Sequence, residues 1–244
     1  MLKEFESTVL DVKMLTKDTV SCILECPKEF DFKAGQYVLV GIDVNHPKLK
    51  GKSITGAEGK KIRRAYSIVN SPSVKGTVEV CVKRVEPGVI SGVICELKKG
   101  EKVTLIGPFG HFLVRKTDRD LVFVAVGVGI APFVSMITNL LEKDFPQNII
   151  LVKGARSEKD KLYDKVFIDL EKKYDNFKFH NVLSRPDEDF ENTGYVQNFL
   201  AKYVKDSFNS DYYLCGLQNM IEDVKEVLKM SGVPVNQIFY EKFD

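Results

Sequence analysis

The segment 64–67 places a cation, an aromatic ring and a hydroxyl side by side, in the order Arg64, Ala65, Tyr66 and Ser67. On an extended strand, Arg64 and Tyr66 project to one face and Ser67 to the other. An arginine can hold a pyrophosphate with a bidentate fork, and a tyrosine ring can cover a flat heterocycle. A serine hydroxyl can hydrogen-bond a ring nitrogen. The alternative is a surface arginine, a half-buried tyrosine and a turn serine, because so short a pattern recurs by chance.

A glycine-rich turn at 127–132 follows the apolar run 121–126, which is typical of a strand buried on both faces. Gly127 and Gly129 would let the backbone approach a pyrophosphate, whose charge the N-terminus of the next helix would face. Pro132 fits the first helical turn, where its missing N–H costs nothing. In this context the turn indicates a dinucleotide phosphate site, and the alternative is a tight strand-to-helix connection.

A second glycine turn precedes a short helix predicted near residues 89–97. Its candidate binding residues are Gly88, Val89, Ile90 and Ser91. Backbone N–H groups exposed at such a turn, together with the helix dipole, favour a phosphate. Taken alone, this segment fits an ordinary helix start better than a binding site.

The two halves of the chain that position these segments have different patterns. Residues 1–114 contain β-rich runs such as 19–25 and 77–83, separated by glycine and proline, which predict an antiparallel barrel or sandwich. Residues 115–244 alternate strands and helices, which predicts a doubly wound parallel sheet. We therefore expect two domains, 1–114 and 115–244, joined by the charged link 115–120. The expected elements of the second domain are helices near 132–143, 162–173, 196–204 and 219–230 and strands near 121–126, 148–153, 177–183, 212–214 and 238–240.

Four motifs, in this order, resemble those of the ferredoxin–NADP(+) reductase family of flavoenzymes. They are R-x-Y-S at 64–67, G-x-x-S at 88–91, G-P-x-G at 107–110 and G-x-G-x-x-P at 127–132. The resemblance implies a Greek-key β-barrel that binds FAD, followed by a domain that binds NADPH or NADH. It places FAD on the first two motifs and the pyrophosphate of the nicotinamide dinucleotide on the last.

The resemblance also assigns residues near the reacting atoms. Cys215, followed by Gly216, resembles the family's C-G pair, and it would position the nicotinamide rather than act as a nucleophile. Ser67, Glu241 and Phe243 complete the set expected beside the chemistry. Phe243 would be the aromatic residue that shields the flavin ring.

The choice between NADPH and NADH depends on residues at the end of the strand predicted near 177–183. Ser184 and Arg185, with Tyr195, occupy positions that grip the 2′-phosphate in family members that use NADP, but Thr193 stands where a lysine often helps. Four carboxylates crowd the same loop: Asp187, Glu188, Asp189 and Glu191. Because their charge would oppose a phosphate, we expect only a slight preference for NADPH over NADH.

Composition bounds the remaining possibilities. The chain has 244 residues, of which 44% are hydrophobic and 29% charged, so it can bury a core and stay in solution. It shows no apolar run long enough for membrane insertion and no signal-peptide stretch at its start. Its five cysteines are scattered, which predicts a cytoplasmic protein without disulfides or a metal site. A net charge of +2 argues against nucleic acid as a partner, and we expect a monomer.

The resemblance implies hydride transfer from the nicotinamide to the flavin, followed by single-electron transfer to a separate ferredoxin, flavodoxin or oxygenase component. The enzyme alternatives are a free-flavin or ferric reductase and an electron-transfer subunit of a larger complex. A non-catalytic flavin- or nucleotide-binding module is the alternative of another class.

The segment 46–64 is rich in lysine and arginine. A solvated insertion is the simplest interpretation. The sharper ones are a landing site for an acidic redox partner and a contact to the adenine end of FAD.

Overall fold

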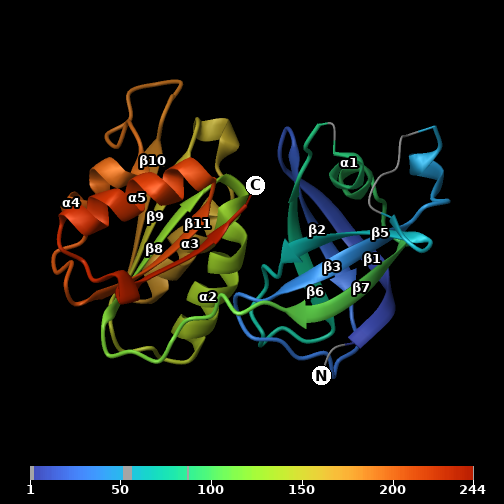
Figure 1. Cartoon of the computed structure of the whole chain (residues 1–244), viewed down its shortest axis with the longest axis horizontal. Coiled ribbons are helices and arrows are strands. Elements are labelled where there is room, and N and C mark those ends of the chain that lie inside the picture. Colours follow the sequence, from blue (N-terminus) through green and yellow to red (C-terminus); the bar gives the residue numbers. More distant parts are fainter. Residues whose placement is uncertain (1–2, 52–56, 87, 244) are drawn as a thin grey trace. The chain divides into compact units, whose positions relative to one another are not determined.

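The computed structural model describes residues 3–51, 57–86 and 88–243. The chain divides into two compact units, residues 1–113 and 114–244, which are taken in turn (Figure 1).

The first unit is an antiparallel β-barrel. Its strands are β1 (Lys3–Thr16), β2 (Thr19–Glu25), β3 (Tyr37–Asp43), β4 (Ala57–Glu58), β5 (Lys61–Ser67), β6 (Thr77–Lys83) and β7 (Lys102–Phe109). They pair in the order β4-β5-β3-β7-β1-β2-β6. An antiparallel bridge between Ile68, which follows β5, and Val80 of β6 closes this sheet on itself. Alternation along the strands explains the barrel, because Val78, Val80 and Val82 are fully buried on one face of β6.

One short helix belongs to the barrel, α1 (Val89–Cys95). Its Ile90, Val93 and Ile94 join the barrel core. A glycine at the N-cap, Gly88, begins the helix.

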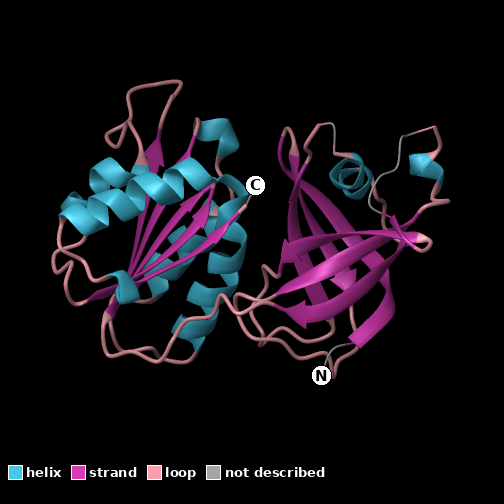
Figure 2. Ribbon diagram, viewed as in Figure 1, coloured by secondary structure: helices cyan, strands magenta, loops and turns pink. Residues whose placement is uncertain are grey.

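The second unit is a parallel sheet with helices on both faces (Figure 2). Its strands are β8 (Asp120–Val126), β9 (Ile149–Ala155), β10 (Phe177–Leu183), β11 (Ser210–Gly216) and β12 (Ile238–Lys242), in the order β10-β9-β8-β11-β12. Its helices are α2 (Ala131–Glu142), α3 (Asp164–Lys173), α4 (Leu200–Tyr203) and α5 (Gln218–Met230). The adjacent strands β8 and β11 are deeply buried: β8 buries five consecutive residues and β11 all seven. The predicted fold class, a β-barrel followed by a doubly wound parallel sheet, is confirmed.

Two predicted helices differ in detail. The helix expected near 162–173 begins only at Asp164, because Tyr163 adopts the left-handed conformation with φ 60°. The helix expected near 196–204 opens as a 3₁₀ turn, Val196–Phe199, and is α-helical only from Leu200 to Tyr203.

Within the described residues, no helix is long and apolar enough to cross a membrane. The same part of the chain holds no group of three or more His, Cys, Asp and Glu side chains arranged for a metal ion.

Candidate functional site

The barrel presents the first candidate set on β5. Arg64 is exposed, and its guanidinium donates a hydrogen bond to the Arg63 carbonyl at 2.8 Å. No carboxylate of the described residues pairs with it, so its fork is available to an anionic ligand. Tyr66 packs partly against the barrel core, and burial raises the pKa of its phenol, which keeps the hydroxyl neutral. Ser67 is buried, whereas Ala65, which lies between Arg64 and Tyr66, is exposed.

The turn before α1 is shaped by Ser91. The Ser91 hydroxyl accepts a hydrogen bond from the Val85 N–H at 3.1 Å and lies 3.4 Å from the Val85 and Gly88 carbonyls. A Cβ on Gly88 would lie 2.7 Å from the Val85 oxygen, so only glycine fits there. The Ser91 hydroxyl thus folds the turn rather than pointing freely outward. Ile90 is buried in the core, which leaves its backbone as the part that could meet a ligand.

Arg84 is not among the residues predicted from the sequence, yet it holds the C-terminal end of α1 by hydrogen bonds. Both terminal guanidinium nitrogens of Arg84 donate to one oxygen of Glu96, the C-cap residue of the helix, at 3.0 Å. No sequence signal marks this pair, because its members are twelve residues apart on different elements.

The second unit gathers its candidates at the carboxyl ends of its strands, where doubly wound sheets bind ligands. The turn Gly127–Ile130 joins β8 to α2, and Gly127 has φ 58°, a conformation that glycine tolerates. A Cβ on Gly129 would lie 2.3 Å from the Cys215 carbonyl oxygen, so the turn is pressed against the end of β11. Pro132 lies in the first turn of α2, as its ring requires.

Cys215 lies beside this turn. Its side chain is fully buried, and burial raises the pKa of the thiol well above its ordinary value, with a further rise from the charge of Glu241. The thiol is therefore neutral and is no nucleophile. Glu241 is its register partner on β12, and burial raises the pKa of that carboxyl too.

The last residues return to the same place. The Phe243 N–H donates to the Gly216 carbonyl at 3.0 Å. Gly216 has φ 142°, and a Cβ there would meet the Val126 oxygen at 2.9 Å. Gly129, Cys215, Gly216, Glu241 and Phe243 thus form one cluster, which is the packing expected of a strand-end nucleotide site.

Two further candidates follow a contact at the end of β10. A parallel bridge joins Leu183 and Thr193, and Arg185 and Tyr195 each lie two residues beyond it. The Ser184 and Arg185 N–H groups donate to the Ala155 and Arg156 carbonyls at 3.0 and 2.7 Å, which continues the pairing of β10 with β9. Tyr195 is 62% exposed, so its ring is free to cover a base.

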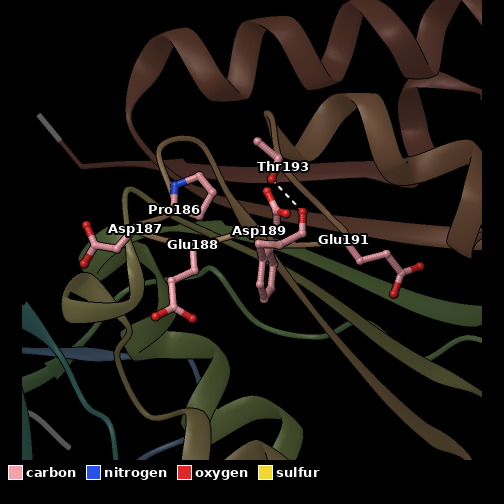
Figure 3. A pocket seen from close by; sticks show the side chains of 7 residues that line it. Pro186, Asp187, Glu188, Asp189, Glu191 and Thr193 are labelled. Carbon is pink, nitrogen blue, oxygen red and sulfur yellow. Dashed lines mark hydrogen bonds between the residues drawn. The ribbon is translucent and has the colours of Figure 1, made fainter.

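The loop after β10 encloses an open hollow of about 610 Å³ (Figure 3). Its lining consists of Pro186, Asp187, Glu188, Asp189, Phe190, Glu191 and Thr193. Two of the four carboxylates are in ion pairs, Asp187 with Lys159 and Glu191 with Lys202, each at 2.8 Å. The negative charge predicted for this loop is therefore partly neutralised by neighbouring lysines.

Some lysine side chains of the segment 46–64 form ion pairs. Lys48 pairs with Glu101, and Lys61 pairs with Glu4 at 3.2 Å. Lys50 and Lys60 are exposed, whereas Lys52 lies outside the described residues.

Two protein-family models match the chain: the oxidoreductase FAD-binding domain over residues 6–113 and the oxidoreductase NAD-binding domain over residues 123–226. Among curated proteins, the chain is 32% identical to the phenol hydroxylase P5 protein of Acinetobacter pittii (strain PHEA-2), over 100% of this chain and 66% of that protein. It is 30% identical to a component of the Na(+)-translocating NADH-quinone reductase of Histophilus somni (strain 129Pt), over 99% of this chain and 68% of that one.

Solved structures share the fold over almost the whole chain. The cytochrome P450 reductase GcoB of Amycolatopsis superposes with a TM-score of 0.85 at 25% identity, covering 99% of this chain and 70% of that one. A ferredoxin NADP+ reductase from Neisseria gonorrhoeae, with bound FAD and NADP, gives 0.83 at 21% identity over 98% of each chain. Some curated relatives are longer: the chain spans 66% of the phenol hydroxylase protein and 60% of the matching NADH-quinone reductase component of Pseudoalteromonas atlantica (strain T6c / ATCC BAA-1087).

Proposed function

Because this chain belongs to the ferredoxin–NADP(+) reductase-like family of FAD- and NAD-binding oxidoreductases, we propose that it passes electrons from NADPH or NADH through FAD to a separate one-electron acceptor. It is a flavin-dependent reductase whose cofactors are FAD and a nicotinamide dinucleotide. The observation that carries the proposal is the cluster of Gly129, Cys215 and Glu241, where a glycine turn, a buried thiol and a partly buried carboxyl meet at the carboxyl ends of neighbouring strands.

The barrel residues fit the FAD side of this function. The guanidinium of Arg64, which no carboxylate of the described residues pairs with, would bind the pyrophosphate, the ring of Tyr66 would cover the isoalloxazine, and Ser67 would hydrogen-bond its edge. When bound, FAD accepts a hydride and releases electrons singly, which is chemistry no side chain supplies.

The second unit fits the donor side. The backbone of the turn Gly127–Ile130 would hold the pyrophosphate at the start of α2, where N–H groups and the helix dipole favour negative charge. Cys215 is buried and neutral, so its contribution is to position the nicotinamide. Glu241 holds a proton more tightly than an exposed carboxyl, which limits negative charge beside the reacting ring.

The acceptor that we propose is a small redox protein, such as ferredoxin or flavodoxin, or an oxygenase component. Related proteins are named for such assemblies: a phenol hydroxylase protein and the ferredoxin reductase in carbazole 1,9a-dioxygenase. Exposed Lys50 and Lys60 would favour an acidic partner. The relatives named as components of an NADH-quinone reductase support a second candidate, an electron-transfer component of a larger complex.

We also propose that the protein is a cytoplasmic monomer. None of the five cysteines is joined in a disulfide, which fits a reducing compartment.

The proposal is tested by coupling the two half-reactions. Holoprotein with NADPH or NADH should reduce cytochrome c rapidly only when ferredoxin or flavodoxin is added. Equal rates without either carrier, together with fast reduction of added free FMN, would instead support a free-flavin reductase.

A further inference from the structure

The loop 184–193 carries Arg185 and leads to Tyr195, two residues that the family resemblance assigns to the 2′-phosphate of the donor. Backbone hydrogen bonds close its base: the Leu183 N–H donates to the Asn192 carbonyl at 3.0 Å, and the Gly194 N–H donates to the Leu183 carbonyl at 2.8 Å. This closure brings the segment before Arg185 and the segment before Tyr195 together at Leu183 and Thr193. The conformation of this loop therefore sets the backbone positions from which the side chains of Arg185 and Tyr195 extend.

The side chain of Asn192 ties this loop to two further elements, β10 and α4, by hydrogen bonds. Its Nδ2 donates to the Asn181 carbonyl of β10 at 3.1 Å. Its Oδ1 accepts from the Tyr203 hydroxyl of α4 and from Lys202 Nζ, the latter at 3.2 Å. Strand, loop and helix thus meet at one half-buried amide.

Tyr203 is a firm anchor for this amide. Its ring stacks on His180 of β10, with centroids 3.6 Å apart and planes 7° from parallel. The ring of Phe199 also lies nearly parallel to it, with centroids 6.3 Å apart. Because the phenol cannot turn away without breaking these contacts, its hydroxyl holds Asn192 in one place.

The ion pairs of the loop hold it less firmly than these hydrogen bonds do. The ion pairs Lys159–Asp187 and Lys202–Glu191 join exposed side chains, which contribute little. Glu188 and Asp189 are exposed as well (Figure 3). Asn192 is the loop residue whose side chain bonds both β10 and α4, so its loss would loosen the loop while the backbone hydrogen bonds at its base remain.

We propose that Asn192 is a positioning residue for the nicotinamide donor, which it serves by fastening loop 184–193 so that Arg185 and Tyr195 face the dinucleotide together. This inference rests on the proposed function. A loosened loop must be ordered again when the dinucleotide binds, and that entropy is lost from affinity. The reacting ring, held by other residues, is unaffected.

The test compares holoprotein with its Asn192→Ala variant. Calorimetry with NAD+ and NADP+ measures donor-site affinity without turnover, and steady-state rates give kcat and KM. We expect the Kd and the KM of the preferred dinucleotide to rise about tenfold, with kcat and FAD content unchanged, because binding is weakened equally in the ground state and the transition state.

Asn176→Ala is the matched control. The Asn176 Nδ2 also donates to two backbone carbonyls, those of Phe145 and Gln147, at 2.7 and 2.9 Å, but in the connection that leads into β10. It should lower the melting temperature without changing Kd. If both variants change Kd equally, the effect is general destabilisation and the positioning role is wrong.

Tyr203→Phe provides a second, milder variant that keeps the stacked ring. It should raise Kd in the same direction, and the double variant should bind no worse than Asn192→Ala alone. Unchanged Kd in both single variants would overturn the inference while leaving the proposed function intact. Failure of the wild-type holoprotein to bind either dinucleotide would remove the proposed function and the inference together.

Discussion

Arg64 stands exposed on β5, and no carboxylate of the described residues pairs with its guanidinium. Arg64→Ala should therefore leave the barrel folded but weaken FAD retention by about tenfold or more, the loss of a charge-assisted bidentate contact. The flavin content after gel filtration and the Kd for FAD measure this. Arg64→Lys is the control: it keeps the charge but loses the fork, so it should fall between the two. Full flavin occupancy in the alanine variant would remove Arg64 from the pyrophosphate.

Arg185 is also exposed, two residues after the end of β10. If its guanidinium meets a 2′-phosphate, Arg185→Ala should raise the KM for NADPH about tenfold and leave that for NADH nearly unchanged. Steady-state kinetics with both donors decides the matter. Equal effects on the two donors would show that Arg185 does not recognise the phosphate.

At the scale of elements, the turn after β8 and the end of β11 are packed too closely for any side chain between them. Gly129→Ala would place a methyl group 2.3 Å from the Cys215 carbonyl oxygen, so one element must move. We expect a loss of about 1–3 kcal/mol in stability and a loss of dinucleotide binding.

The control for that variant is Gly92→Ala in α1. A methyl group there would meet its nearest neighbour, Arg84, at 3.5 Å, an ordinary contact. Its melting temperature should stay near that of the wild type. A Gly129→Ala protein that binds NAD+ and NADP+ normally would contradict the close approach.

The contact of β10 with α4 predicts a pH dependence. Burial against Tyr203 lowers the pKa of His180, Glu171 opposes this shift, and Lys202 and Lys178 add to it. As pH falls below the ordinary histidine value of about 6.5, the unfolded chain takes up the proton first, so this residue's contribution to stability is progressively lost. The difference in unfolding free energy between wild type and His180→Gln, from urea titrations, should narrow on acidification. A difference that is constant with pH would contradict this assignment.

At the scale of the whole molecule, the sequence predicts what depends on local pattern. Alternation in β6 and the apolar run of β8 are signals within single segments, so the barrel and the parallel sheet could be predicted. The glycine turns could be predicted too, because the backbone there is set by residue type.

What escaped prediction depends on contacts between distant residues. Asn192 reaches Asn181 and Tyr203, each eleven residues away on another element, and nothing in its own segment marks it. The 3₁₀ start of the helix at Val196 and the left-handed Tyr163 are also set by packing, which overrides local propensity.

The proposed function requires that a hydride pass from a nicotinamide donor to FAD bound by this protein. The most direct measurement is the visible spectrum of the anaerobic holoprotein, recorded by stopped flow after mixing with NADPH and, separately, with NADH. We expect a yellow protein whose flavin band bleaches rapidly with at least one donor. A protein purified without flavin that does not take up FAD, or a yellow one that neither donor reduces, would contradict it.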